Sequence, residues 1–394
     1  MVCVNKNVKV IFVSGLLSAF IIGIFELLFP FYLEYIGISL VDMGLIFSVS
    51  TLVISFLSIF LGEYADVYGK KKIYLASCTM GVASKAVFPF SLNELQILGT
   101  KFLNDLHDNL RITVHNIMLY ENVRDSYAKL LSWFTTIEFV LQASGTIFFA
   151  FFLTYLGYSG LFLILATVEA TKLLVLLFYR ENNRKEGKKM SLKKAYSFKI
   201  EKNLLILSLT SAVASLGFGI AHGFLLPLYF RGKYNLDVTQ ISIITVLHRL
   251  SFMTTPLADR FIKKLGLRST YIFSTSAYAL SFLAIGFWTF PIPVFVALFL
   301  IHDLLGGGIG MTAMSVMTQN LTDNETRTRQ INTFNAIQTP MTILAPSISG
   351  MLAAISWDYT FIAGGLFYCI SLAIFSVLLK SKSLIPKSTI KQIV

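Results

Sequence analysis

Hydrophobic runs of about 20 residues recur along the whole chain, and short polar segments separate them. A run of this length is long enough to cross a hydrocarbon core about 30 Å thick as an α-helix. The first run is too long for the apolar region of a cleaved signal peptide, so we expect it to remain as a span. The pattern predicts an all-α membrane protein with twelve membrane-spanning helices, at residues 10–33, 41–63, 73–90, 94–119, 129–154, 158–179, 204–229, 238–257, 269–289, 293–318, 328–354 and 358–379.

A polar and basic segment between the sixth and seventh predicted spans divides them into two groups of six. The two groups resemble each other, because Pro30 and Pro227 lie 197 residues apart within the similar sequences GIFELLFPFY and GIAHGFLLPLY. Duplicated halves are common in secondary transporters, whose substrate sites lie where the halves meet near the membrane midplane. The predicted domains are an N-terminal six-helix bundle at 1–180, a cytoplasmic central loop at 181–202 and a C-terminal six-helix bundle at 203–394.

Composition and charge agree with a membrane protein. Of the 394 residues, 55% are hydrophobic and 14% are charged, and the mean hydropathy is +0.70; soluble domains are roughly 25% charged. The net charge of +12 would suit a nucleic-acid-binding protein, but 26 of the 33 Lys and Arg fall in segments predicted to lie on one side of the membrane. This asymmetry is the positive-inside pattern. It predicts a multi-pass protein of the cell membrane with both termini in the cytoplasm and no nucleic-acid partner.

The sequence offers little support for an enzyme or a cofactor site. Cys3, Cys78 and Cys369 are scattered, without the spacing of a zinc site, an iron–sulfur cluster or a disulfide framework. No GxGxxG, Walker or GxSxG motif occurs in a setting that fits its chemistry. We therefore expect no cofactor, no bound metal and no enzymatic activity. Two alternatives stay open: an intramembrane lipid-modifying enzyme that uses His-Asp pairs, and a membrane sensor that transports nothing.

Two loops contain related motifs. GEYADVYGKKK (Gly62 to Lys72) resembles the loop 2–3 signature of the major facilitator superfamily, roughly G-x-L-A-D-x-x-G-[RK]-[RK], and PLADRFIKKLGLR resembles its weaker copy in the second half. With twelve spans and a basic central loop, the resemblance extends over nearly the whole chain. It implies two pseudo-symmetric bundles and a motif that favours one transport conformation; the alternative is a solvated loop that only sets topology. The gating residues it implies are Gly62, Asp66, Gly69, Lys70, Lys71, Asp259, Arg260, Gly266 and Arg268.

The fourth predicted span has a charged stripe, although each charge at a bilayer centre costs roughly 2.5 to 3.5 kcal/mol on insertion scales. Lys101, Asp105, Asp108, Arg111 and His115 fall within about 120° of helix circumference. Their spacings of three and four residues predict a ladder of ion pairs of alternating sign. A stripe this wide indicates a water-filled cavity or a buried ion-pair network.

Most ionisable side chains inside the predicted spans lie on the first, fourth, fifth, seventh, eighth and tenth. The family resemblance implies that these helices line or flank the central path. Lys85, Glu169 and Lys172 lie on outer helices in that arrangement; we expect Lys85 to extend to the membrane surface and Glu169 to neutralise Lys172. His titrates near neutral pH when carboxylates stand near it. Proton coupling, or a satisfied structural network, is therefore predicted for Glu26, Asp105, His107, Asp108, Glu138, His302 and Asp303.

The cationic side chains of the spans suit an anionic substrate group, because a guanidinium pairs with carboxylate or phosphate. Pairing with Asp105 and Asp108 is the alternative. The candidate substrate-binding residues are Lys101, Arg111, His115, His222 and Arg249. Together these patterns predict a monomeric secondary transporter in membrane lipid. We expect it to move a small polar or amphipathic organic solute by alternating access, coupled to protons, with import and export both open.

Overall fold

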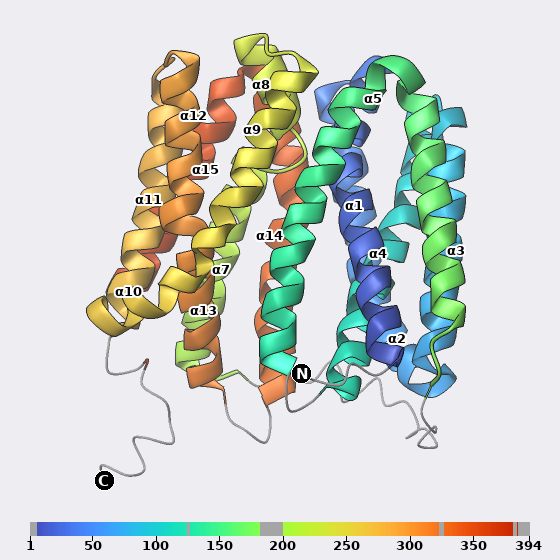
Figure 1. Ribbon diagram of the computed structural model, residues 1–394. Helices are drawn as coiled ribbons and strands as arrows, with labels where there is room; N and C mark the ends of the chain where they lie inside the picture. The colour runs from blue at the N-terminus through green and yellow to red at the C-terminus, as the bar shows by residue number, and fades with distance from the viewer. Residues whose placement is uncertain (1–5, 124–126, 182–199, 323–326, 381–383, 385–394) are drawn as a thin grey trace. The chain divides into compact units, whose positions relative to one another are not determined.

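The computed structural model describes residues 6–123, 127–181, 200–322, 327–380 and 384, with the backbone alone described at 58–68, 127–132, 256, 327–329 and 332. Within these ranges the chain is helical and forms no β-strand (Figure 1). Each of the twelve predicted spans coincides with helix over most of its length. The all-α fold class predicted from the hydrophobic runs is confirmed.

The chain forms two compact units. Unit 1 comprises Met1–Asp42, Val49–Ser191 and Asp237–Arg249, and unit 2 comprises Met43–Ser48, Leu192–Leu236 and Leu250–Val394. The predicted domain boundaries at residues 180 and 203 stay a prediction.

Unit 1 is built mainly from the first half of the chain. Its helices are α1 (Lys6–Tyr35), most of α2 (Leu40–Tyr68), α3 (Lys70–Val87) with the 3₁₀ turn η1 (Phe88–Phe90), α4 (Glu94–Asn122) and α5 (Tyr127–Leu177), together with most of α9 (Val238–Ser251) (Figure 1). The long α5 turns back at Gly157, whose φ of 61° is readily adopted only by glycine. This turn separates the predicted spans 129–154 and 158–179.

Unit 2 holds most of the second half. Its helices are α7 (Lys202–Ala221), α8 (Leu226–Tyr234), the end of α9 (Val238–Ser251), η3 (Phe252–Leu257), α10 (Ala258–Leu265), α11 (Leu267–Phe287), α12 (Ile292–Ile301), η4 (His302–Gly307), α13 (Gly308–Leu321), α14 (Arg327–Ile355) and α15 (Trp357–Leu378). Two predicted spans are interrupted. The seventh breaks between α7 and α8, and the tenth passes through η4, which is a π-helical turn.

Eight described helical segments are long and apolar enough to cross a membrane, and a bent pair at Val238–Thr255 and Ala258–Leu265 would be a ninth. One of the eight, Trp133–Leu177, contains the turn at Gly157 and so includes two predicted spans. With 29 residues, α4 is also long enough to cross a membrane. Its charged stripe makes it too polar to be counted among the eight apolar segments. The chain is therefore a multi-pass membrane protein.

Helices α1 and α5 pack closely through two glycines. A Cβ atom added at Gly23 would lie 2.0 Å from the carbonyl oxygen of Gln142, and one at Gly145 would lie 2.3 Å from the carbonyl oxygen of Phe20. The Thr146 hydroxyl donates a hydrogen bond across the same seam to the carbonyl of Gly23, at 3.0 Å. Small residues at such contacts let helix backbones approach in a membrane. The seam holds α1 in a fixed register beside the charged helix α4.

Candidate functional site

The charged stripe of α4 forms ion pairs within unit 1. Lys101 Nζ lies 2.6 Å from Asp105 Oδ1, and the Ser50 hydroxyl donates to the same carboxylate at 2.6 Å. One turn further along, Arg111 Nε lies 3.3 Å from Asp108 Oδ1. The predicted i, i+4 and i, i+3 pairs are both present. Lys101 and Arg111 thus have carboxylate partners of their own, which favours internal pairing as their role.

Glu169 lies at the centre of a second network, against α3 and α4. It pairs with Lys172 on its own helix, its Oε2 is 3.9 Å from Lys85 Nζ, and its Oε1 is 3.3 Å from His107 Nε2. These four side chains are at most 2% exposed. The expectation that Lys85 extends to the membrane surface is wrong, because its ammonium group also donates to Asn104 Oδ1 at 3.1 Å. The predicted pairing of Glu169 with Lys172 is correct, but the pair is buried beside the stripe.

The hydrogen bonds of His107 fix the direction of its ring. Nδ1 lies 2.8 Å from the carbonyl oxygen and 3.0 Å from the hydroxyl of Ser77, so this edge of the ring faces Ser77 on α3. Nε2 then faces the Glu169 carboxyl at 3.3 Å. A hydrogen bond between these two atoms needs a proton on one of them. His107 and Glu169 therefore face each other at a separation that one proton can bridge.

A cavity of about 220 Å³ opens onto this network inside unit 1. Its apolar wall includes Ile21, Ile22 and Phe25 of α1. Seven of its lining side chains are ionisable: Glu26, Lys85, His107, Asp108, Arg111, Glu169 and Lys172. The cavity brings together four residues predicted for proton coupling or substrate binding and adds three that the family layout had assigned to outer helices.

Other predicted site residues of unit 1 lie away from the lining of this cavity. His115 Nδ1 is 3.2 Å from the Tyr74 hydroxyl, and its ring stacks on Phe134. Glu138 is half-buried on α5. Arg249 forms an ion pair with Glu26 and donates to Gln142. These contacts favour packing and pairing roles for His115 and Arg249.

Unit 2 contains a larger cavity of about 680 Å³. No Lys, Arg, His, Asp or Glu is among the described residues that line it. Gln338 of α14 lies in its wall, where its Oε1 accepts hydrogen bonds from the hydroxyls of Ser211 and Ser215 at 2.9 and 3.3 Å. Aromatic rings, among them Phe218 and Tyr278, complete the lining. The cavity combines neutral hydrogen-bonding groups with flat apolar surfaces.

A search for ionisable groups alone does not find these polar residues, which carry no charge. A signal was present: Asn335, Gln338 and Thr342 recur at helical spacing in the eleventh predicted span, and Ser211 and Ser215 are one turn apart in the seventh. Amide and hydroxyl groups on one face of a membrane helix indicate a polar interior contact.

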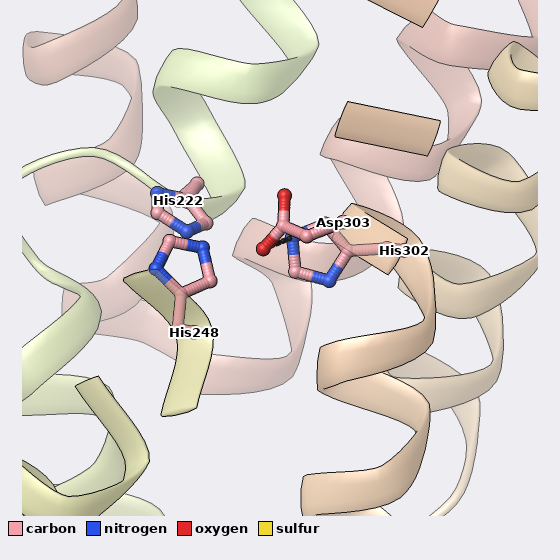
Figure 2. A group of neighbouring side chains, drawn as sticks. All are labelled: His222, His248, His302 and Asp303. Atoms are coloured by element: carbon pink, nitrogen blue, oxygen red, sulfur yellow. Dashed lines mark ion pairs between the residues drawn. The ribbon is translucent and has the colours of Figure 1, made fainter. Parts of the chain in front are cut away.

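Three other predicted residues meet elsewhere in unit 2. His222 ends α7, while His302 and Asp303 begin η4, and Figure 2 shows their side chains pointing toward one another. His302 Nε2 lies 3.2 Å from Asp303 Oδ2, and the two imidazole ring centres are 5.8 Å apart. The sequence predicts a substrate role for His222 and proton roles for His302 and Asp303; in the structure the three form one cluster.

The motif after α2 is ordered around Gly69, whose φ of 95° favours glycine. The backbone N–H of Lys70 donates to Glu181 Oε1 at 2.7 Å, and the Lys70 ammonium pairs with Glu121. Lys71 donates to the carbonyls of Leu177 and Tyr179 at 2.8 and 2.7 Å, at the end of α5. Gly62 and Asp66 lie in α2, but their side chains are outside the described part of the chain.

The second copy of the motif repeats part of this geometry. Gly266 has a φ of 80°, and Arg268 donates to the carbonyls of Ser376 and Leu379 at 2.8 and 3.1 Å, at the end of α15. Asp259 is exposed and pairs with Lys263 at 2.6 Å, and Arg260 is also exposed. Arg268 therefore ties two helices of its unit together, whereas Asp259 makes a local surface pair.

Comparison with known proteins agrees with this architecture. The sequence model of the Major Facilitator Superfamily matches residues 11–247 and 207–392. No curated protein sequence matches the chain. A variant of the nucleoside transporter NupG has a similar structure, with a TM-score of 0.79 and 15% identity over 95% of this chain and 100% of that one.

Two bacterial structures show the same fold. A homologue of the iron transporter ferroportin, in its inward-facing state, has a TM-score of 0.77 and 15% identity over 93% of this chain and 97% of that one. A homologue of the human lysosomal transporter Spinster has a TM-score of 0.73 and 12% identity, covering 94% and 95%. At these identities the similarity establishes the fold alone.

Proposed function

The chain belongs to the major facilitator superfamily, a family of membrane transporters, and we propose that it is a secondary active transporter for a small, uncharged organic solute. The observation that supports this substrate class is the cavity of unit 2. Its volume of about 680 Å³ falls within the range of roughly 300–1,000 Å³ typical of small-molecule sites. A transporter whose charged groups are paired elsewhere recognises its solute through neutral contacts.

The lining of the cavity defines the solute further. Gln338, Ser211 and Ser215 offer amide and hydroxyl groups, which bind hydroxyl, carbonyl or amine groups of a ligand. Phe218, Phe252 and Tyr278 offer ring faces, which pack against a flat apolar part. An ionised solute would find no opposite charge among the described lining residues. We therefore narrow the predicted polar or amphipathic solute to an uncharged one with both a hydrogen-bonding edge and an apolar face.

We further propose that transport is coupled to protons through unit 1. The support is the pair His107–Glu169, whose Nε2 and Oε1 atoms are 3.3 Å apart and can share a proton, in a cavity that also contains Asp108. The ammonium groups of Lys172 and Lys85 both face the carboxylate of Glu169. Protonation of Glu169 removes the partner charge of both lysines, so loading and release of the proton change the stability of the whole network. Such a network has two states whose populations a pH gradient biases.

The surrounding placement is part of the proposal. The asymmetric distribution of Lys and Arg supports a cell-membrane location with cytoplasmic termini. We propose a monomer that alternates access between its duplicated halves, with the two copies of the loop motif acting as gates. The cavities of unit 1 and unit 2 are compatible with either uptake or efflux of the solute. The sign of the pH gradient that drives accumulation decides between symport and antiport.

Purified protein in proteoliposomes tests the substrate class. A thermal-shift screen should pair neutral molecules with charged analogues of the same size. We expect the neutral molecules, and not their charged analogues, to raise the melting temperature of the protein. The molecules that do so should also show counterflow. Gln338→Leu should lower the counterflow rate at least tenfold, because it leaves two serines without their acceptor. Ser144→Ala, which removes an exposed hydroxyl bonded to its own helix, is the control variant and should transport normally.

The outcomes separate the alternatives. If only anions bind, the substrate site would lie at Arg111 and Lys101, and the proposal that the unit 2 cavity binds the solute would be wrong. A solute that binds tightly without any flux would indicate a sensor, and chemical conversion of a bound lipid would indicate an enzyme. Equal solute accumulation with and without an imposed pH gradient would remove proton coupling while leaving the transport proposal intact.

A further inference from the structure

We propose that His222, His302 and Asp303 form a binding site for a divalent transition-metal ion within unit 2. All three side chains are buried, with exposures of 9%, 0% and 0%. Each presents a ligand atom, and these atoms lie within 4.8 Å of one another (Figure 2). The proposed site uses these three side chains of unit 2; His248, also labelled in Figure 2, belongs to unit 1. The site is separate from the solute cavity, whose lining includes none of the three.

The separation of the donor atoms suits a metal ion. His302 Nε2 and Asp303 Oδ2 are 3.2 Å apart. Two ligands bound at about 2.1 Å in tetrahedral geometry lie about 3.4 Å apart, so this pair needs little movement to coordinate one ion. The ring centre of His222 is 5.8 Å from that of His302, and a ring nitrogen of His222 lies within 4.8 Å of the donor atoms of His302 and Asp303.

The surrounding aromatic residues hold both imidazoles in place. The His222 ring stacks on Phe218 with a centre distance of 4.6 Å, and the His302 ring lies 4.8 Å from Phe299 and 5.1 Å from Phe282. The carboxylate is oriented as well, because the Tyr278 hydroxyl donates to Asp303 Oδ1 at 3.2 Å. That bond leaves Oδ2 directed at His302. Ligands fixed by an outer shell of this kind are typical of metal sites.

Irregular backbone brings the three ligands together. The span that contains His222 is broken between α7 and α8, and His302 and Asp303 begin the π-helical turn η4. π-Helical turns are rare and occur frequently at functional sites, and broken membrane helices typically surround bound ions or substrates. Gly306 permits the close approach of Tyr278, because a Cβ at that position would lie 2.6 Å from the tyrosine ring.

The donor set selects the class of ion. Two imidazoles and one carboxylate suit first-row divalent ions such as Zn²⁺, Co²⁺ or Fe²⁺, whereas Ca²⁺ and Mg²⁺ prefer oxygen ligands alone. One carboxylate and two neutral imidazoles leave a bound divalent ion with a net charge of +1. The ion therefore keeps at least one open position for water or an anion, as three-ligand metal sites do.

Co²⁺ is the probe for the test, because its visible absorption reports nitrogen and oxygen ligands directly. The full chain is purified in detergent through an affinity tag without histidine, stripped with chelator and titrated calorimetrically. We expect about one equivalent of Co²⁺ to bind. His302→Gln and Asp303→Asn should weaken binding more than about 100-fold, and Tyr278→Phe, which removes only the outer-shell hydroxyl, about 10- to 100-fold.

His115→Gln is the matched control, because it removes a buried imidazole from unit 1 and should leave Co²⁺ affinity unchanged. Thermal unfolding in chelator shows whether each variant folds; if His302→Gln does not, His222→Gln and Tyr278→Phe give the answer. Absence of Co²⁺ binding, or binding and absorption that persist in the His222, His302 and Asp303 variants, would overturn the proposal. The titration involves no solute flux, so its failure would leave the transport proposal unaffected.

Discussion

Lys71 and Arg268, 197 residues apart, make the same kind of contact in the two halves of the chain. Each follows a glycine of positive φ by two residues, and each donates to carbonyl oxygens at the end of another helix of its own unit. A cation at a helix C-terminus is favourable because the free carbonyl groups there are partly negative. The duplicated motif therefore fastens one helix to another in both units.

Removing either cation should destabilise the protein. We expect Lys71→Gln and Arg268→Gln each to lower the free energy of unfolding by about 1–2 kcal/mol, since each loses charged hydrogen bonds to helix-end carbonyls. Thermal unfolding in detergent measures the effect. Lys72→Gln is the control, because Lys72 is exposed, and its melting temperature should match the wild type. Equal melting temperatures for all three variants would contradict a fastening role.

The seam between α1 and α5 should not tolerate a methyl group. Gly23→Ala and Gly145→Ala place a Cβ against the facing backbone, so we expect a cost of about 1–3 kcal/mol or more. Gly99→Ala is the matched control, because nothing lies within 4 Å of its added Cβ. Alanine is also more favourable than glycine in a helix, by up to about 1 kcal/mol. Its stability should be unchanged or slightly higher. Wild-type melting of Gly23→Ala would mean that the seam is looser than the structure indicates.

The Glu169–Lys172 pair should show strong coupling. Glu169→Gln leaves the buried Lys172 and Lys85 ammonium groups without this carboxylate and should cost about 3–5 kcal/mol. Lys172→Met leaves Glu169 with Lys85 alone and should also destabilise the protein. The double variant should cost less than the sum of the two single variants, since it removes both charges of this pair, while Lys85 loses Glu169 in the single Glu169→Gln variant as well. Chemical or thermal unfolding of all four proteins completes the cycle. Glu94→Gln, an exposed acid on α4, is the control for loss of one negative charge. Additive single effects would show that the two side chains act independently.

His107 should be needed for coupling more than for transport. In His107→Gln we expect counterflow to continue, while accumulation becomes the same with and without a pH gradient, because the shared proton site is lost. Ser77→Ala removes one hydroxyl but leaves the backbone carbonyl that faces His107 Nδ1, so this variant should stay coupled. If the His107 variant still accumulates more solute with a pH gradient than without one, the proton site lies elsewhere.

Helical periodicity was sufficient to predict the pairs on α4. Lys101 and Asp105, and Asp108 and Arg111, are close in sequence on one regular helix, so their spacing determines their contact. The same reasoning gave the helical class, and the loop motifs indicated the family that the comparison confirms. Local spacing is sufficient where one helix supplies both partners.

Contacts between helices depend on rotation, which the sequence pattern does not define. Glu169 was assigned to an outer helix, but the side chains of such a helix point both outward and inward, and this one points at His107. His222 and His302 are separated by 80 positions, and their meeting depends on a helix break and a π-helical turn without a clear sequence signature. Gln338 was missed for a different reason: neutral groups were given no weight.

The π-helical turn η4 also determines the rotational phase of the helix that follows it. A π turn holds about one residue more than an α turn, and one residue corresponds to about 100° of rotation. In the present phase α13 directs Ala313 and Met317 into an apolar core, and Ser315 and Thr318 toward the cavity of unit 2. Without the surplus residue each position would advance by one, and Thr318 would replace Met317 in that core. A single inserted residue thus decides which side chains of α13 line the unit 2 cavity.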